Sequence, residues 1–266
     1  EAKRAMAAKI AAKITDAAND PTEPAGIPRV HWSRGLVSPA GWAFAIWGPI
    51  FLGESALTAM AAAPGLTASN PVASGMLASA APWFAGVCGL QSLWCAAFRP
   101  WAKRVQHFWL PAALLSAEAA ALSGAHGALI ASSASKPMTI ATYVCVHLPV
   151  AMHFGWITAA AVVSANSFAQ VARWAPSTKL SFAFVSVWLA VATAAGVSIT
   201  TGDPVIALTV AWALSAVAAD GGKSDTNEFG DVPLKALAHS AATAAKGLSG
   251  IGLLIIAKNV LEVLRS

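Results

Sequence analysis

Apolar stretches separated by short polar connectors dominate the chain from residue 40 onward. Crossing a hydrocarbon core of roughly 30 Å takes about 20 apolar residues in a helix, and most of these stretches reach that length. They lack the alternation of about ten residues that is typical of barrel strands. The pattern therefore predicts an all-α polytopic transmembrane helical bundle of about seven spans, at residues 40–63, 77–98, 107–133, 139–168, 180–199, 204–219 and 236–262.

The number seven depends on the break between the fifth and sixth stretches. Gly202, Asp203 and Pro204 are residues that interrupt helices, and they stand at that point. Without a break, the two stretches would form one helix about twice as long as a bilayer core needs. Six spans remain the alternative, since the sixth stretch is short. The glycine-containing stretch 220–235 is predicted to be a loop and not a second domain.

Residues 1–38 differ in character from the rest of the chain. Met6, Ile10 and Ile14 stand at helical spacing and predict a short amphipathic helix, which either lies at the membrane interface or forms a solvated tail. A proline-containing connector follows it. The expected organisation is a polar N-terminal segment at 1–38 and a transmembrane helical domain at 39–266.

Composition agrees with a lipid environment. The chain is 57% hydrophobic and 11% charged, against about 25% charged in ordinary soluble domains. Lys and Arg collect in the N-terminal segment and in the second, fourth and sixth connectors, so the N-terminus is expected on the cytosolic or stromal side of the membrane. Because the basic residues lie between apolar stretches and not on one folded face, no nucleic-acid binding is predicted.

Motifs for catalysis or metal binding are not found in the sequence. The chain has no HExxH, no nucleophile elbow and no complete phosphate-binding loop. The three cysteines, Cys88, Cys95 and Cys145, cannot all pair within one chain, and they form no CxxC motif. We predict no enzyme, no catalytic residue and no metal site.

Aromatic residues form a stripe in the first apolar stretch. Phe44, Trp47, Phe51 and Glu54 are spaced three, four and three residues apart, which places them on one helical face. That face either stacks on a flat ligand or packs against the next helix. Spacing alone favours packing, because aromatic stripes on helices usually belong to the core.

Four sequence stretches resemble one known family. Residues 38–54, SPAGWAFAIWGPIFLGE, resemble the Pro-x-x-aromatic-x-Phe-x-x-Trp signature of the TspO and translocator-protein family, and look closest to its longer relatives, the tryptophan-rich sensory proteins. LQSLWCAAF at 90–98 and FGWITAAAVVSAN at 154–166 are similar to later family elements, and DPVIALTVAWAL at 203–214 looks like a later span of the longer relatives.

The resemblance implies a helical membrane protein related to binders of porphyrins and lipids, with no settled reaction. Gln91 stands where the family often has Asn. A helix that the family places before Pro39 has no counterpart here, so the pocket would lack one wall. The positions that match the family's motifs, and that the resemblance implies as ligand-binding residues, are Trp42, Phe44, Trp47, Trp94, Trp156 and Asn166.

Polar side chains within the apolar stretches are further candidates for functional residues, because an ionisable side chain at membrane depth is costly unless it is paired or hydrated. A lone axial ligand of haem or chlorophyll needs no spacing motif, and a hydrogen-bonded packing role is favoured for each His. Glu54 and Lys246 are expected to neutralise each other across helices. His147 and His153, six residues apart, lie on different helix faces. The candidate tetrapyrrole-metal ligands are Glu54, Gln91, Glu118, His126, His147, His153 and His239.

Two functions are therefore expected. The first is a non-enzymatic integral membrane protein that binds a tetrapyrrole or lipid. The second is an accessory subunit of a pigment-bearing photosynthetic complex in the plastid thylakoid, with chlorophyll or another porphyrin as cofactor and with lipids and other subunits as partners. A small-molecule transporter, or a purely structural subunit of another energy-converting complex, is the alternative. No internal repeat supports a transporter.

Overall fold

The computed structural model describes residues 35–97, 107–134, 138–220 and 226–265, and these contain helices but no strand. The amphipathic helix expected near the N-terminus lies outside the described residues. The elements are η1 (Gly41–Ile46), α2 (Trp47–Ala62), η2 (Pro64–Leu66), α3 (Pro71–Ala97), α4 (Trp109–Ser133), α5 (Ile140–Thr142), η5 (Tyr143–His147), α6 (Leu148–Val171), α7 (Pro176–Thr201), α8 (Pro204–Asp220), α9 (Thr226–Phe229) and α10 (Asp231–Arg265).

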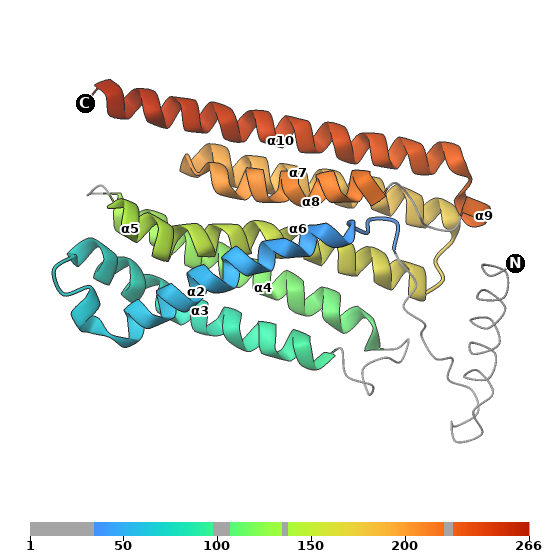
Figure 1. Cartoon of the computed structure of the whole chain (residues 1–266). Helices are drawn as coiled ribbons and strands as arrows, with labels where there is room; N and C mark the ends of the chain where they lie inside the picture. The colour runs from blue at the N-terminus through green and yellow to red at the C-terminus, as the bar shows by residue number, and fades with distance from the viewer. Residues whose placement is uncertain (1–34, 98–106, 135–137, 221–225, 266) are drawn as a thin grey trace, which may run out of the picture.

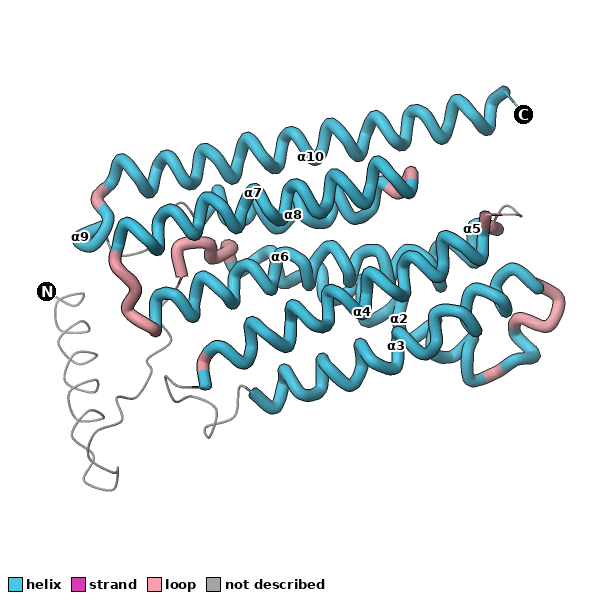
Figure 2. Tube along the Cα trace, turned by 180° about the vertical axis from the view of Figure 1, so that it is seen from behind, coloured by secondary structure: helices cyan, strands magenta, loops and turns pink. Residues whose placement is uncertain are grey.

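The long helices lie side by side in one bundle (Figure 1). Within the described residues, six helical segments are long and apolar enough to cross a membrane, and α8 is a shorter apolar helix of 17 residues. The predicted all-α polytopic bundle of about seven helices is confirmed. Consecutive long helices run in opposite directions, as Figures 1 and 2 show, so the bundle has two ends. One end carries the α7–α8 connector and the other carries the α6–α7 connector.

Helices α6 and α8 form the centre of the bundle. More than half of the residues of each are buried, and α6 packs against α2, α4, α7 and α8. Helix α8 lies between α6, α7 and α10. Gly155 allows α6 and α8 to approach closely, because a Cβ there would lie 2.7 Å from Cβ of Thr209. The short α8 is thus surrounded mainly by protein.

The predicted break between the fifth and sixth stretches is present. Helix α7 ends at Thr201, and Gly202 takes the left-handed conformation with φ 70°. A glycine adopts that conformation at little cost, which explains its place after the last helical residue. Oδ1 of Asp203 then accepts the backbone N–H of Val205 at 2.9 Å and caps α8, whose first residue is Pro204.

Helix ends differ from the predicted stretches at two places. Helix α3 begins at Pro71, six residues before the apolar stretch, and α10 extends from Asp231 to Arg265. The predicted loop at 220–235 contains α9 and the first turn of α10. Proline, serine and glycine at the start of α3, and charged residues at the start of α10, lower the hydropathy of these turns, whereas the helices continue through them.

A π-helix at Tyr143–His147 joins α5 to α6. Pro149 follows two residues later and has no N–H to donate to the carbonyl of Cys145, which favours a local departure from α-helical bonding. Single-turn π segments are rare and often occur at functional sites. The side chain of His147, the last residue of this segment, is buried.

Candidate functional site

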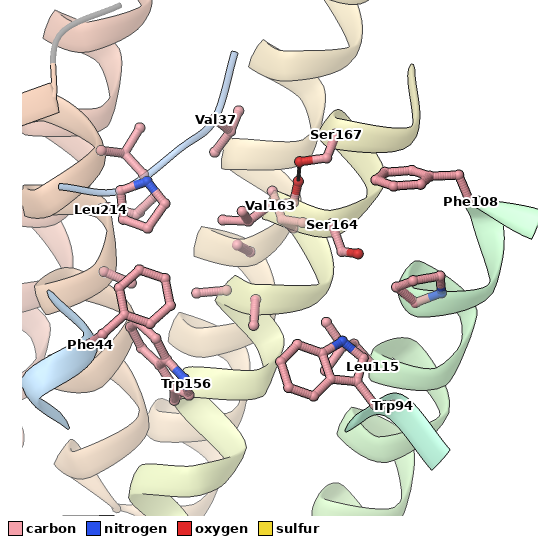
Figure 3. Close-up of a pocket in the computed structure, with 18 residues that line it drawn as sticks. Val37, Phe44, Trp94, Phe108, Leu115, Trp156, Val163, Ser164, Ser167 and Leu214 are labelled. Atoms are coloured by element: carbon pink, nitrogen blue, oxygen red, sulfur yellow. Dashed lines mark hydrogen bonds between the residues drawn. The ribbon is translucent and has the colours of Figure 1, made fainter. Parts of the chain in front are cut away.

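An apolar pocket of about 340 Å³ lies toward the end of the bundle that carries the α6–α7 connector. Its lining comes from η1, α3, α4, α6, α7 and α8, and from the chain just before η1. Figure 3 shows Phe44, Trp94 and Trp156 gathered at one end of the pocket, with Val37, Ser167 and Phe108 at the other. The volume falls near the lower limit of the roughly 300–1,000 Å³ of small-molecule sites.

Three aromatic residues from separate elements shape one end of this pocket. Phe44 and Trp156 meet edge to face, with ring centroids 5.5 Å apart. Trp94 comes from α3 and lines the pocket together with Leu115 of α4. Such edge-to-face pairs hold rings in fixed orientations, so the pocket offers a preformed aromatic surface.

The lining contains few polar groups. Ser164 and Ser167 carry its side-chain hydroxyls, and Ser167 already donates to the carbonyl of Val163 at 3.0 Å. No imidazole, thiol or carboxylate belongs to the lining among the described residues. The described lining is therefore mainly apolar and contains none of the three side-chain groups that commonly ligate a haem iron.

A polar cluster lies deeper in the bundle, where α2, α3, α4 and α6 meet; we call Glu54, Gln91, Glu118 and His153 the carboxylate–His153 cluster. Nδ1 of His153 is 2.6 Å from Oε1 of Glu54, and its Nε2 is 3.2 Å from Oε1 of Glu118 without hydrogen-bond alignment. With its amide nitrogen facing Glu118, Gln91 donates to Oε1 and Oε2 of that carboxylate at 2.7 and 3.1 Å. Buried charges need such partners.

A second polar cluster, the histidine–Asp203 cluster, consists of His126, His147 and Asp203. Nε2 of each histidine lies 2.8 Å from Oδ2 of Asp203, and all three side chains are buried. Burial alone would raise the pKa of the Asp203 carboxyl, but hydrogen bonds from His126 and His147 outweigh burial and lower that pKa below its ordinary value. The carboxylate is thus held in its ionised form at the α7–α8 connector.

Comparison with protein families identifies the chain. A family model described as TSPO-like protein matches residues 30–254. The chain belongs to the TSPO-like family. The match extends through α8 and most of α10, so it covers more of this TSPO-like chain than the motifs of the first four spans. No curated protein and no solved structure matches the chain.

The residues predicted from the family motifs lie in three settings. Phe44, Trp94 and Trp156 line the pocket. Trp47 stacks on Phe51 at 4.8 Å and has its ring 5.4 Å from that of His153, beside the carboxylate–His153 cluster. Trp42 and Asn166 contact other helices.

Trp42 and Asn166 make helix-to-helix contacts. The ring of Trp42 lies 4.6 Å from that of Trp212, edge to face. Nδ2 of Asn166 donates to Oγ of Ser186 at 2.8 Å and so joins α6 to α7. Neither residue lines the pocket.

One part of the pocket wall comes from α8 and from the segment before η1. Leu214 and Val217 of α8, with Val37 and Pro39, line that part of the pocket. Sequence analysis did not assign these four residues, because aliphatic side chains and prolines carry no chemical signature. Their position depends on α8 packing beside η1, where Ala40 N–H donates to the carbonyl of Ala216 at 2.9 Å.

The polar candidates separate between the two clusters and the surface. Glu54, Gln91, Glu118 and His153 belong to one cluster, and His126 and His147 to the other, whereas His239 is exposed on α10. His147 and His153 lie in different clusters, in agreement with their predicted different faces. The predicted pairing of Glu54 with Lys246 is wrong. Helix α2 packs against α6 and not α10, so Glu54 meets His153, while Lys246 is exposed.

Proposed function

We propose that this TSPO-like chain is a non-enzymatic membrane protein that binds an apolar ligand, a tetrapyrrole or a lipid, in the pocket. The observation that carries the proposal is the convergence of Phe44, Trp94 and Trp156, three motif positions from separate elements, on one apolar cavity. Stacking on indole rings and burial of apolar area would supply the binding free energy.

The side chains that line the pocket restrict the classes of ligand that fit it. The side-chain polar groups of the lining are two serine hydroxyls and two indole N–H groups, so the pocket favours a metal-free tetrapyrrole or a lipid chain over a haem that needs an imidazole, thiolate or carboxylate ligand. A guest that buries its apolar part against Trp156 and places a polar edge near Ser164 would match the distribution of polar and apolar groups (Figure 3).

Titration of the purified protein in detergent with metal-free protoporphyrin, haemin and a fluorescent fatty acid tests the proposal. We expect quenching of Trp fluorescence by the metal-free porphyrin or the fatty acid, with haemin no tighter than metal-free porphyrin. The variant Ala160→Phe fills the pocket without removing an aromatic residue, so it should weaken binding at least tenfold. Trp188→Phe, at an exposed position on α7 outside the lining, is the matched control. Unchanged affinity in Ala160→Phe would contradict the proposal.

A second candidate is the accessory subunit of a pigment-bearing complex. The feature that favours it is α10, a helix of 35 residues whose exposed face carries His239, an imidazole at the surface of the bundle. Chlorophyll bound there, against a neighbouring subunit, would explain an open histidine on an apolar helix. Gentle solubilisation would then yield a large pigmented particle, and His239→Leu would lose one pigment without affecting porphyrin binding in the pocket.

A further inference from the structure

The histidine–Asp203 cluster joins three separate parts of the chain near the end of the bundle that carries the α7–α8 connector. His126 comes from α4, His147 from the end of the π-helix, and Asp203 from the turn before α8. Their exposed fractions are 1%, 2% and 4%. The pocket lies toward the opposite end, so the cluster is not part of the proposed ligand site.

The three donor atoms converge on one point. Nε2 of each histidine is 2.8 Å from Oδ2 of Asp203, and the three atoms lie within 4.8 Å of one another. Ligands of a tetrahedral zinc ion stand about 2.0–2.2 Å from the metal, and hence about 3.4 Å from one another. To hold the ion, Oδ2 would move about half an ångström away from each nitrogen, and donor atoms that lie as far apart as 4.8 Å would move closer together.

The surroundings hold the donors in place. Oδ1 of Asp203 accepts the Val205 N–H, which fixes the carboxylate and leaves Oδ2 for the histidines. The Tyr143 ring stacks on the His147 ring at 5.4 Å and restricts its rotation. Outer contacts of this kind orient metal ligands in known sites.

The His147 ring has one nitrogen that makes no hydrogen bond, so it can carry its proton there and use the other nitrogen as a ligand. Nδ1 of His147 is buried and has no hydrogen-bond partner in the described structure. With its proton on Nδ1, the ring would have Nε2 free as a ligand, and a bond to a metal ion would replace the hydrogen bond between Nε2 and Oδ2 of Asp203. A neutral imidazole is the form that binds metal.

Charge favours a cation at this position. Among the described residues, no Lys or Arg pairs with Asp203; its ion-pair partners are the two histidines. A cation bound between the two imidazoles would place positive charge beside this buried carboxylate. Buried charges are normally paired or bound to metals.

We infer that His126, His147 and Asp203 bind one divalent transition-metal ion, with zinc as the best match to two imidazoles and one carboxylate. The ion would clamp α4, the start of α6 and the α7–α8 connector, with a fourth position open to water. Sequence analysis predicted no metal site, because the three ligands stand 21 and 56 residues apart and follow no spacing motif.

The test uses tag-free protein in detergent, stripped with a chelator and dialysed against Zn²⁺, with bound metal measured by mass spectrometry. We expect one equivalent of zinc per chain. Co²⁺ should give intense visible bands of a four-coordinate site, unlike the weak bands of the hydrated ion. Uptake well below one equivalent, or a spectrum of hydrated Co²⁺, would show a hydrogen-bonded cluster only and overturn the inference.

Substitution of single residues tests which side chains bind the metal ion. His126→Gln and Asp203→Asn keep size and hydrogen bonding, and each should weaken zinc binding by about 100-fold, at least as much as the loss of an outer-shell partner. His239→Gln, at the exposed histidine of α10, is the matched control and should keep full uptake. Equal zinc uptake in all three variants would overturn the assignment. If a variant does not fold, the Co²⁺ spectrum of the wild-type protein still tests whether a four-coordinate metal site is present.

Discussion

Nδ1 of His153 lies 2.6 Å from Oε1 of Glu54, so an imidazole of α6 and a carboxylate of α2 meet inside an apolar bundle. On the other side of the same ring, Oε1 of the fully buried Glu118 lies 3.2 Å from Nε2. One imidazole thus stands between two carboxylates from different helices. A single side chain of α6 therefore links α2 to α4.

Replacing His153 by Phe should destabilise the protein strongly. The ring shape is retained, but Glu54 and Glu118 both lose their imidazole, and breaking a buried ion pair costs about 3–5 kcal/mol. Glu54→Gln should cost less, about 1 kcal/mol, because the amide oxygen can still accept from His153 and the Glu54 side chain is partly exposed. Thermal unfolding in detergent, followed by circular dichroism, measures both effects.

The exposed pair Lys258–Glu262 on α10 provides the control, with its charged atoms 3.7 Å apart. Exposed pairs contribute about 0–1 kcal/mol, so Glu262→Gln should leave the unfolding midpoint nearly unchanged. A His153→Phe variant as stable as Glu262→Gln would show that the carboxylate–His153 cluster does not hold the helices together.

The sequence predicted the long helices and the break between α7 and α8 better than it predicted where each helix begins. Apolar stretches predicted the helices, because lipid requires long apolar segments whatever their neighbours are. The Gly202–Pro204 break was also recognisable, since Gly and Pro restrict the backbone locally. The start of α3 at Pro71 was not, because proline, serine and glycine interrupt the apolar pattern there although the helix continues through them.

The sequence did not predict which helices contact one another. Phe44, Trp94 and Trp156 were found from family motifs, and the structure brings them together. Glu54 was paired with the wrong partner because spacing along the chain does not say which helices are neighbours. Asp203 was read only as part of a helix break, although its carboxylate contacts two histidines far away in sequence.

Gly155→Ala should disturb the central α6–α8 contact. The added methyl would lie 2.7 Å from Cβ of Thr209 and 3.1 Å from the carbonyl oxygen of Ile206, so the helices must separate. Overpacking of this kind costs about 1–3 kcal/mol. Gly247→Ala on α10 has open space around the new methyl and is the matched control. Equal thermal midpoints for the two variants would mean that α6 and α8 separate without cost.

Glu228→Gln should loosen α9 from the ends of α6 and α7. Glu228 pairs with the buried Lys179 and accepts from Nε2 of Gln170 at 3.1 Å. Because the Lys179 ammonium would lose its carboxylate partner, we expect destabilisation of about 1–3 kcal/mol and faster amide exchange at residues 226–229. Asp231→Asn, which alters an exposed pair with Lys235, is the control. Unchanged exchange in Glu228→Gln would contradict the role of this ion pair.

Trp212→Phe tests the link between α8 and η1. Nε1 of Trp212 donates to the carbonyl of Ala43 at 3.0 Å, and its ring meets Trp42 edge to face. Phe retains most of the ring contact but removes the donor, so the loss should be about 0.5–1.5 kcal/mol. Amide exchange at residues 41–46 should rise, and porphyrin affinity should fall slightly, because Phe44 on η1 lines the pocket. Trp188→Phe, at an exposed tryptophan, should change neither quantity. If exchange at η1 stays slow in Trp212→Phe, packing alone holds η1 on α8.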